Sequence, residues 1–179
     1  PITGFGDANG DILFIGLAPA AHGGTRTGRV FTGDKSSDFL YKCLHKAKIS
    51  NQSNSDHVND GLKLNKAYIT TALKCVPPED KPLKKELDNC SRFFNQEIKF
   101  LSNVKTIVAL GKIAFDACKY FYQKQFTLDK KIKFGHGKIY KLENGISLVG
   151  CYHPSPRNVN TGRINEKKMV SLFNKIKKI

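Results

Sequence analysis

Two segments of the sequence carry most of the residues whose types and spacing suit chemistry. The first, residues 16–34, is rich in glycine and directly follows the apolar run 12–15. The second places His153 between an apolar run and a loop stiffened by prolines. A histidine in such a place can be a purely structural hydrogen-bonding group. The polar loop beside it favours a functional role, because its side chains can donate to phosphate: Ser155, Arg157, Asn158, Asn160 and Arg163.

The elements that must position these segments follow from the apolar pattern. Short apolar runs alternate with amphipathic stretches, as in a doubly wound sheet. We expect strands over 11–16, 67–73, 104–110 and 145–152, and helices over 37–47, 83–101, 112–123 and 165–179. The chain, residues 1–179, is therefore predicted to be a single α/β domain, a three-layer α/β/α arrangement with a central four-stranded parallel sheet.

Local signals refine the boundaries of these elements. Ser36 or Ser37 is suited to cap the first helix, and Pro82 is suited to the first turn of the second. Residues 50–61 are rich in Asn, Ser and Asp and are predicted to form an exposed excursion. Parallel strands end at one edge of their sheet, so the segments after residue 16, over 70–75 and after residue 153 are expected to converge on one pocket.

The charge of the chain points to a polyanionic partner. Lys and Arg number 30 against 15 Asp and Glu, a formal net charge of +15. The alternative is a lysine-rich composition of the kind found in heat-adapted organisms. The sequence has no apolar run long enough to span a membrane and no secretory leader at its start, so a cytoplasmic location is expected. Five cysteines, an odd number, argue against a disulfide framework.

Four motifs, in this order and at predicted strand ends, carry a resemblance. They are Gly16-Leu17-Ala18-Pro19-Ala20, Arg29-Val30-Phe31-Thr32-Gly33, Cys75-Val76-Pro77-Pro78 and His153-Pro154-Ser155-Pro156-Arg157-Asn158. Together they resemble the uracil-DNA glycosylase superfamily, most closely its family 5 branch of archaea and thermophilic bacteria. The resemblance implies a monofunctional DNA repair enzyme that flips deaminated bases, uracil and as a further candidate hypoxanthine, out of DNA. It would hydrolyse the N-glycosidic bond and leave an abasic site.

The resemblance also implies roles for individual residues. His153 would contact the uracil O2 and stabilise the departing anion, and backbone groups of Leu17 and Ala18 would help to place the attacking water. Phe31 would stack on the base. Other residues of the substrate site would be Gly16, Thr25 and Thr71. The loop from Pro154 through Gly162, with Arg163, would hold double-stranded or single-stranded DNA, bound by a monomer.

The sequence departs from other branches of the superfamily in two places. Leu17 and Ala18 stand where those branches carry a carboxylate, which agrees with family 5 and shifts the mechanism toward leaving-group stabilisation. Thr70 and Thr71 stand where relatives generally carry Asn, and a threonine hydroxyl makes fewer hydrogen bonds to a base edge. We therefore keep open a catalytically weak or silent DNA-binding member. A flavodoxin-like nucleotide-binding enzyme ranks last, because the glycine loop lacks a Gly-Lys-Ser/Thr ending.

The cysteines bear on a cofactor. By resemblance, Cys75 and Cys90 match two of the four cysteines that hold a 4Fe-4S cluster in some family members. The other two would lie upstream of Pro1, in a segment expected to be missing from a chain that does not begin with Met. Cys43, Cys118 and Cys151 are expected in the core. The chemical step itself would need no cofactor.

Overall fold

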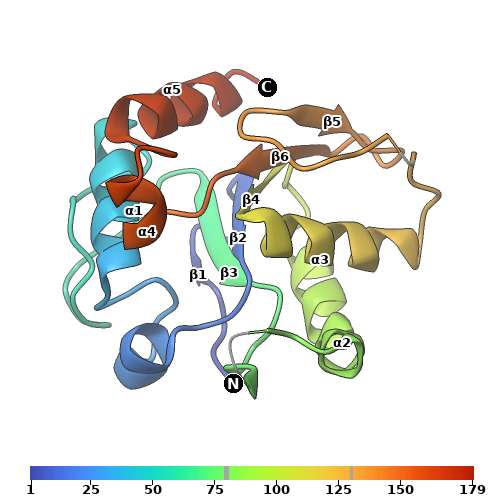
Figure 1. Ribbon diagram of the computed structural model, residues 1–179, viewed down its shortest axis with the longest axis horizontal. Coiled ribbons are helices and arrows are strands. Elements are labelled where there is room, and N and C mark those ends of the chain that lie inside the picture. Colours follow the sequence, from blue (N-terminus) through green and yellow to red (C-terminus); the bar gives the residue numbers. More distant parts are fainter. Residues whose placement is uncertain (79–80, 130) are drawn as a thin grey trace.

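The computed structural model describes residues 1–78, 81–129 and 131–179. Its sheet has six strands in the order β1-β3-β2-β4-β6-β5, between two layers of helices (Figure 1). The strands are β1 (Phe5–Gly6), β2 (Ile12–Gly16), β3 (Ala67–Thr71), β4 (Thr106–Leu110), β5 (Ile139–Lys141) and β6 (Ser147–Cys151). The helices are η1 (Ala21–Thr25, a π-helix), α1 (Lys35–Lys46), α2 (Lys84–Phe100), α3 (Lys112–Gln123), α4 (Pro156–Asn160) and α5 (Glu166–Ile176).

The four inner strands are parallel and lie where the apolar runs predicted them. All five residues of β2, of β4 and of β6 are buried, as expected for parallel strands covered on both faces. The prediction of a four-stranded sheet was wrong, because β1 and β5 add one antiparallel strand at each edge. These two strands contain only two and three residues and are partly exposed, so neither produces a readable apolar run.

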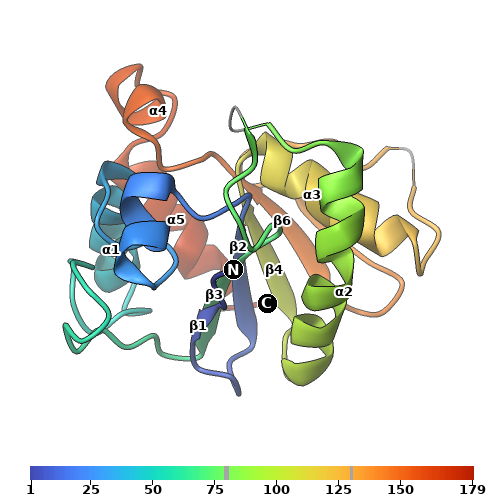
Figure 2. The same ribbon diagram turned by 90° about the horizontal axis from the view of Figure 1, so that it is seen from below.

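The helices divide between the two faces of the sheet. Alternate side chains of β2 point to opposite faces: Phe14 packs edge-on against Phe173 of α5 with ring centroids 5.3 Å apart, while Leu13 and Ile15 join the core formed with α2 and α3. Figure 2 shows α1 and α5 on one side and α2 and α3 on the other. The predicted three-layer α/β/α arrangement is confirmed.

Helix starts differ from the predicted ones. Asp34, not Ser36 or Ser37, is the N-cap of α1, and its Oδ1 accepts a hydrogen bond of 2.9 Å from the Ser37 backbone N–H. Ser37 returns the contact, because its hydroxyl oxygen accepts from the Asp34 N–H at 3.0 Å. The α2 helix begins at Lys84 after an extended Leu83, so Pro82 lies before the helix rather than in its first turn.

The segment 50–61 is only in part the predicted exposed excursion. Ser55 is buried and the side chain of Asp60 is 5% exposed, because both bond to Arg29 of the glycine-rich loop. Composition alone does not reveal this long-range contact. No helix in the described parts of the chain is long and apolar enough to cross a membrane.

Candidate active site

A pocket of about 370 Å³ lies at the carboxyl ends of the parallel strands. The loop after β2, the Pro-Pro turn after β3, the β4–α3 junction and the segment after β6 all contribute to its wall. Its lining residues are Leu17, Ala18, Pro19, Ala20, Pro77, Leu110, Gly111, Lys112, Ile113, Ala114 and His153. The predicted convergence of the strand-end segments is therefore correct for His153, Leu17 and Ala18. The wall from Gly111 to Ala114 was not foreseen, and the glycine directly after an apolar strand was the signal that could have indicated it.

His153 is held in this pocket by two neighbouring residues. Gly111 has φ +108°, and a Cβ built on it would lie 3.2 Å from the His153 Cβ. The His153 segment therefore packs closely against a position that favours glycine. The side-chain amide of Asn158 donates to the His153 carbonyl oxygen at 2.9 Å. Burial lowers the pKa of His153, although the nearby Asp34 carboxylate opposes this shift. Burial therefore favours the neutral imidazole, which can donate one hydrogen bond.

Phe31 lies beside this pocket rather than in its wall. A Cβ added to Gly16 would come within 2.6 Å of the Phe31 ring and 3.5 Å of the Thr71 Cγ2, so ring, glycine and threonine form one packed group. Among the described residues the buried hydroxyl of Thr71 has no hydrogen-bond partner. Two predicted substrate contacts, Phe31 and Thr71, therefore both lie against Gly16, directly before the pocket-lining Leu17.

The backbone of the first motif is tied to the end of β3. The Gly16 carbonyl accepts from the Ala72 N–H at 2.9 Å and the Leu17 carbonyl from the Leu73 N–H at 2.8 Å. Lys74 extends this connection, because its buried ammonium donates to the Thr70 hydroxyl at 2.7 Å and pairs with Glu97 of α2. These bonds fix the loop that forms one side of the pocket. Lys74 and Glu97 are structural contributors that the sequence pattern did not single out.

The predicted DNA-contacting residues divide into two kinds. Ser155 is the N-cap of α4, and the Asn158 amide bonds to the His153 carbonyl, so both have internal roles. Arg157, Asn160 and Arg163 are exposed. The Arg163 guanidinium lies 5.0 Å from the centroid of the Tyr152 ring, which in turn stacks on His136. Figure 2 shows α4, a helix that was predicted as loop, projecting beyond the strand ends that bear the pocket.

The family follows from comparison with known proteins. Residues 3–177 match the model of the Uracil DNA glycosylase superfamily. The chain belongs to the uracil-DNA glycosylase superfamily. Over 180 residues and its whole length it is 41% identical to the type-5 uracil-DNA glycosylase of Mycobacterium tuberculosis, and it spans 66% of that relative. The chain is also 41% identical to the type-5 uracil-DNA glycosylase of Thermus thermophilus, again over its whole length, and spans 80% of that relative. To the type-5 uracil-DNA glycosylase of Pyrobaculum aerophilum it is 38% identical; this match covers 97% of the chain and 74% of the relative.

The type-5 group within this superfamily is the one that the motifs indicated. Sequence identity to the type-4 uracil-DNA glycosylase of Archaeoglobus fulgidus is lower, at 25%. That match covers 86% of the chain and 70% of the relative. Among the predicted substrate contacts, Leu17 lines the strand-end pocket, whereas Gly16, Phe31 and Thr71 lie beside it. Thr25 is exposed at the end of η1 and does not line the strand-end pocket.

The cysteines of this superfamily member fall into two classes. Cys43, Cys118 and Cys151 are buried, as predicted, and burial raises the pKa of the Cys118 thiol to about 12. Cys75 is exposed and Cys90 is partly exposed. Cys75 directly follows Lys74, which forms an ion pair with Glu97 of α2. Glu97 lies on the same helix as Cys90, seven residues or about two turns further along. Within the described ranges no three His, Cys, Asp or Glu side chains gather as a metal-binding group.

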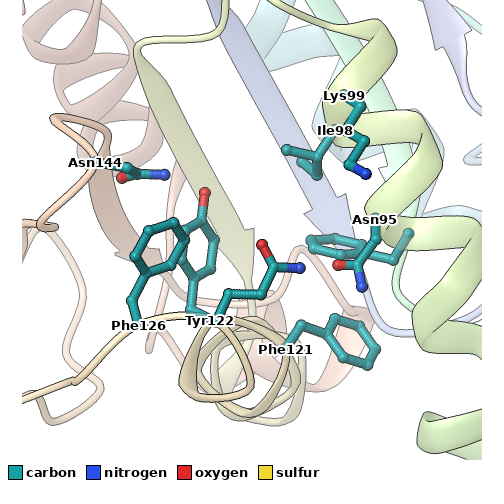
Figure 3. Close-up of a pocket in the computed structure, with 9 residues that line it drawn as sticks. Asn95, Ile98, Lys99, Phe121, Tyr122, Phe126 and Asn144 are labelled. Atoms are coloured by element: carbon teal, nitrogen blue, oxygen red, sulfur yellow. The ribbon is translucent and has the colours of Figure 1, made fainter.

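A second, smaller pocket lies away from the strand ends. It has a volume of about 100 Å³ and is lined by residues of α2 and α3. Figure 3 shows Phe121, Tyr122 and Phe126 facing Asn95 and Ile98 of α2, with Asn144 at one side. Neither His153 nor any residue of the four motifs lines it, so we assign the chemistry to the strand-end pocket.

Proposed function

We propose that this protein excises uracil from DNA by hydrolysis of the N-glycosidic bond and leaves an abasic site. The observation that carries the proposal is the position of the partly buried His153 in a strand-end pocket that it shares with Leu17 and Ala18 of the first motif. The type-5 names of relatives at about 40% identity support the same substrate. The partner is double-stranded or single-stranded DNA, bound by a monomer in the prokaryotic cytoplasm.

The proposed mechanism relies on the leaving group. The flipped uracil stacks on Phe31, and the His153 imidazole donates a hydrogen bond to O2. As the bond between N1 and C1′ breaks, its electron pair passes to the uracil ring, and the hydrogen bond strengthens with the growing negative charge. Water adds to C1′, and its proton balances the charge of the uracil anion. Neither Leu17 nor Ala18 supplies a carboxylate, so His153 contributes most of the catalysis.

Base release and DNA binding on one duplex test this function. The wild-type protein is expected to release free uracil from a U:G pair, and His153→Ala is expected to lose this activity while still binding DNA. Normal release by the variant would remove His153 from the mechanism. Hypoxanthine and thymine opposite G, measured in parallel, define the range of bases.

A second candidate is a weak or silent DNA-binding member of the same superfamily. The buried Thr71 hydroxyl, in place of a longer amide, is the observation that favours it. Salt-sensitive binding to the same duplex without any free base would support this candidate. Restoration of release by Thr71→Asn would assign the weakness to that position.

We also propose that Cys75 and Cys90 supply two thiolates to a 4Fe-4S cluster. Support comes from their access to solvent, in contrast to the three buried cysteines, and from the ion pair that ties the Cys75 segment to α2. Two further ligands would complete the coordination of the cluster. The bound cluster would cross-link this part of the fold and would take no part in hydrolysis. Visible absorbance of the full-length protein, lost in Cys75→Ser and Cys90→Ser but kept in Cys43→Ser, tests the assignment.

A further inference from the structure

Phe31 has an unusual backbone conformation. Its φ is +50°, in the left-handed region that bulky L-residues seldom adopt. A residue persists there only when the surrounding structure enforces the conformation. Its ring is the one that packs against Gly16, so the enforced backbone also decides where the ring stands.

The backbone around Phe31 is held from a distant part of the chain. The Ser55 hydroxyl donates to the Phe31 carbonyl oxygen at 3.1 Å, and the Gly33 N–H donates to the Ser55 carbonyl at 2.8 Å. The Ser55 and Thr32 hydroxyls lie 2.8 Å apart, within hydrogen-bond distance. Thus one buried serine from the segment 50–61 contacts the residues directly around Phe31.

Arg29 organises these contacts. Its guanidinium donates to the Thr32 hydroxyl at 2.9 Å, to the Ser55 hydroxyl at 3.0 Å and to both oxygens of Asp60 at 2.9 and 2.7 Å. The two charged side chains are 3% and 5% exposed. A bidentate pair of this kind fixes orientation as well as distance.

Asp60 connects the pair to its own loop. Its carboxylate also accepts from the backbone N–H groups of Asp56 at 2.9 Å and Leu62 at 3.0 Å. The loop that carries Ser55 is therefore shaped around the same carboxylate that orients Arg29. Loss of the carboxylate would therefore free both the Arg29 side chain and the loop that carries Ser55.

We propose that the buried Arg29–Asp60 ion pair is a positioning device that keeps the Phe31 ring ready to stack on the flipped base. The stacking role rests on the function proposed above, whereas the control of the Phe31 backbone rests on the geometry alone. Arg29 and Asp60 act through Ser55 and Thr32 and do not touch the base. They are positioning residues, distinct from a pair that only stabilises the fold.

Kinetics on a uracil-containing duplex test the stacking role. Asp60→Asn is expected to lower kcat about tenfold and to change KM about twofold or less, because DNA contacts elsewhere stay intact. Inhibition by free uracil is expected to weaken by a similar factor. In a Phe31→Ala background Asp60→Asn should have almost no further effect, since two changes that act through one ring are not additive. Glu166→Gln, which removes a remote surface ion pair with Lys42 and Lys46, is the control and should match the wild type.

A spectroscopic measurement tests the backbone without reference to activity. At positive φ the amide and α hydrogens of one residue come close, so Phe31 should give a strong intraresidue nuclear Overhauser effect. We expect this signal in the wild type and in Glu166→Gln, and its loss in Asp60→Asn and Ser55→Ala. Ser55→Ala and Arg29→Lys provide the same measurements should Asp60→Asn fail to fold.

The outcomes separate the inference from the function on which it rests. Unchanged kcat and an unchanged Phe31 signal in folded Asp60→Asn and Ser55→Ala would overturn the inference and leave uracil excision in place. If Asp60→Asn lowers kcat by the same factor with Phe31 present and in the Phe31→Ala background, the ion pair has a purely structural role, and the inference is also overturned. Should the wild type release no uracil, the proposed function fails, and an unchanged Phe31 signal in the variants would independently overturn the positioning device.

Discussion

At the scale of single residues, the proposed chemistry depends on an imidazole that its surroundings keep neutral. Burial lowers the pKa of His153 and the Asp34 carboxylate raises it, with burial the larger effect. Gly111 and Asn158 set the position of the same residue through a close approach and a hydrogen bond to its carbonyl. Charge and position at His153 are therefore controlled by different neighbours and can be tested separately.

The protonation of His153 predicts the acid side of the pH profile. The excision rate should be constant around neutral pH and fall only at a pH below the ordinary titration range of histidine, because burial lowers the pKa at which the imidazole becomes charged. Stability should fall in the same direction, because the unfolded chain takes up this proton at a higher pH than the folded one. Single-turnover rates from pH 5 to 8 measure the first effect. His153→Asn should show a low rate without this acid limb, and an unchanged limb would assign it to another group.

The position of His153 predicts the effect of Asn158. Asn158→Ala removes the amide that donates to the His153 carbonyl and should lower kcat about tenfold, with a loss of about 1 kcal/mol in the free energy of unfolding. Asn160→Ala, on the same short helix but exposed, is the matched control and should change only KM for DNA. Equal kinetic effects of the two substitutions would contradict a role for Asn158 in placing the histidine.

At the scale of elements, the residue patterns predicted where the main helices and strands lie, but not the contacts between residues far apart in the sequence. Periods of apolar residues were enough to place the four parallel strands, and strand order explains why His153 meets the loop that carries Leu17. The start of α1 was misplaced because Asp34, Ser36 and Ser37 are all good caps, and only the structure shows whose oxygen faces the free N–H groups.

For the candidate site, the sequence predicted which segments meet but not how their side chains bond. The strand-end rule brought the first motif and His153 together without any knowledge of contacts. It gave no sign that Ser55 and Asp60, in a polar stretch, are buried against Arg29, since a long-range ion pair leaves no periodic pattern. Nor did it predict that the Asn158 amide donates a hydrogen bond inside the protein, to the His153 carbonyl.

The N-cap of α1 predicts a stability difference between two substitutions of Asp34. Asp34→Ala should lower the free energy of unfolding by about 1 kcal/mol, because the side-chain partner of the Ser37 N–H is lost. Asp34→Asn keeps a capping oxygen and should retain most of that stability. It should also lower the pKa of His153 further, since the charge that opposes the burial effect is removed. Urea unfolding and histidine NMR titration measure the two effects, and equal instability of both variants would count against the cap.

At the scale of the whole molecule, the chain has a net charge of +15, and the projecting α4 and the residues after it carry the exposed Arg157 and Arg163. The attraction of such charges to DNA is long-range and independent of sequence, whereas base selection belongs to the pocket. Binding and excision should therefore respond differently to ionic strength.

The charge predicts a salt dependence of DNA binding. Affinity for undamaged and uracil-containing duplexes should fall by similar factors as salt rises, since released counterions dominate both. Arg157→Ala and Arg163→Ala should each reduce the slope of log affinity against log salt by about 1. Fluorescence anisotropy at several salt concentrations measures these slopes, and Lys35→Ala, on the exposed start of α1, is a charge-matched control. Slopes unchanged by both arginine substitutions would place the DNA elsewhere.

The two short antiparallel strands have a consequence for how the molecule behaves in a crowded solution. β1 and β5 flank the four parallel strands and offer only two and three residues to a neighbouring chain. A long, bare outer strand would invite pairing between copies and growth into aggregates. Without Phe5 and Gly6 the full length of β3 would be open along its outer side. Those two residues pair with Ile69 and Tyr68 on the outer side of β3, so their loss should increase self-association.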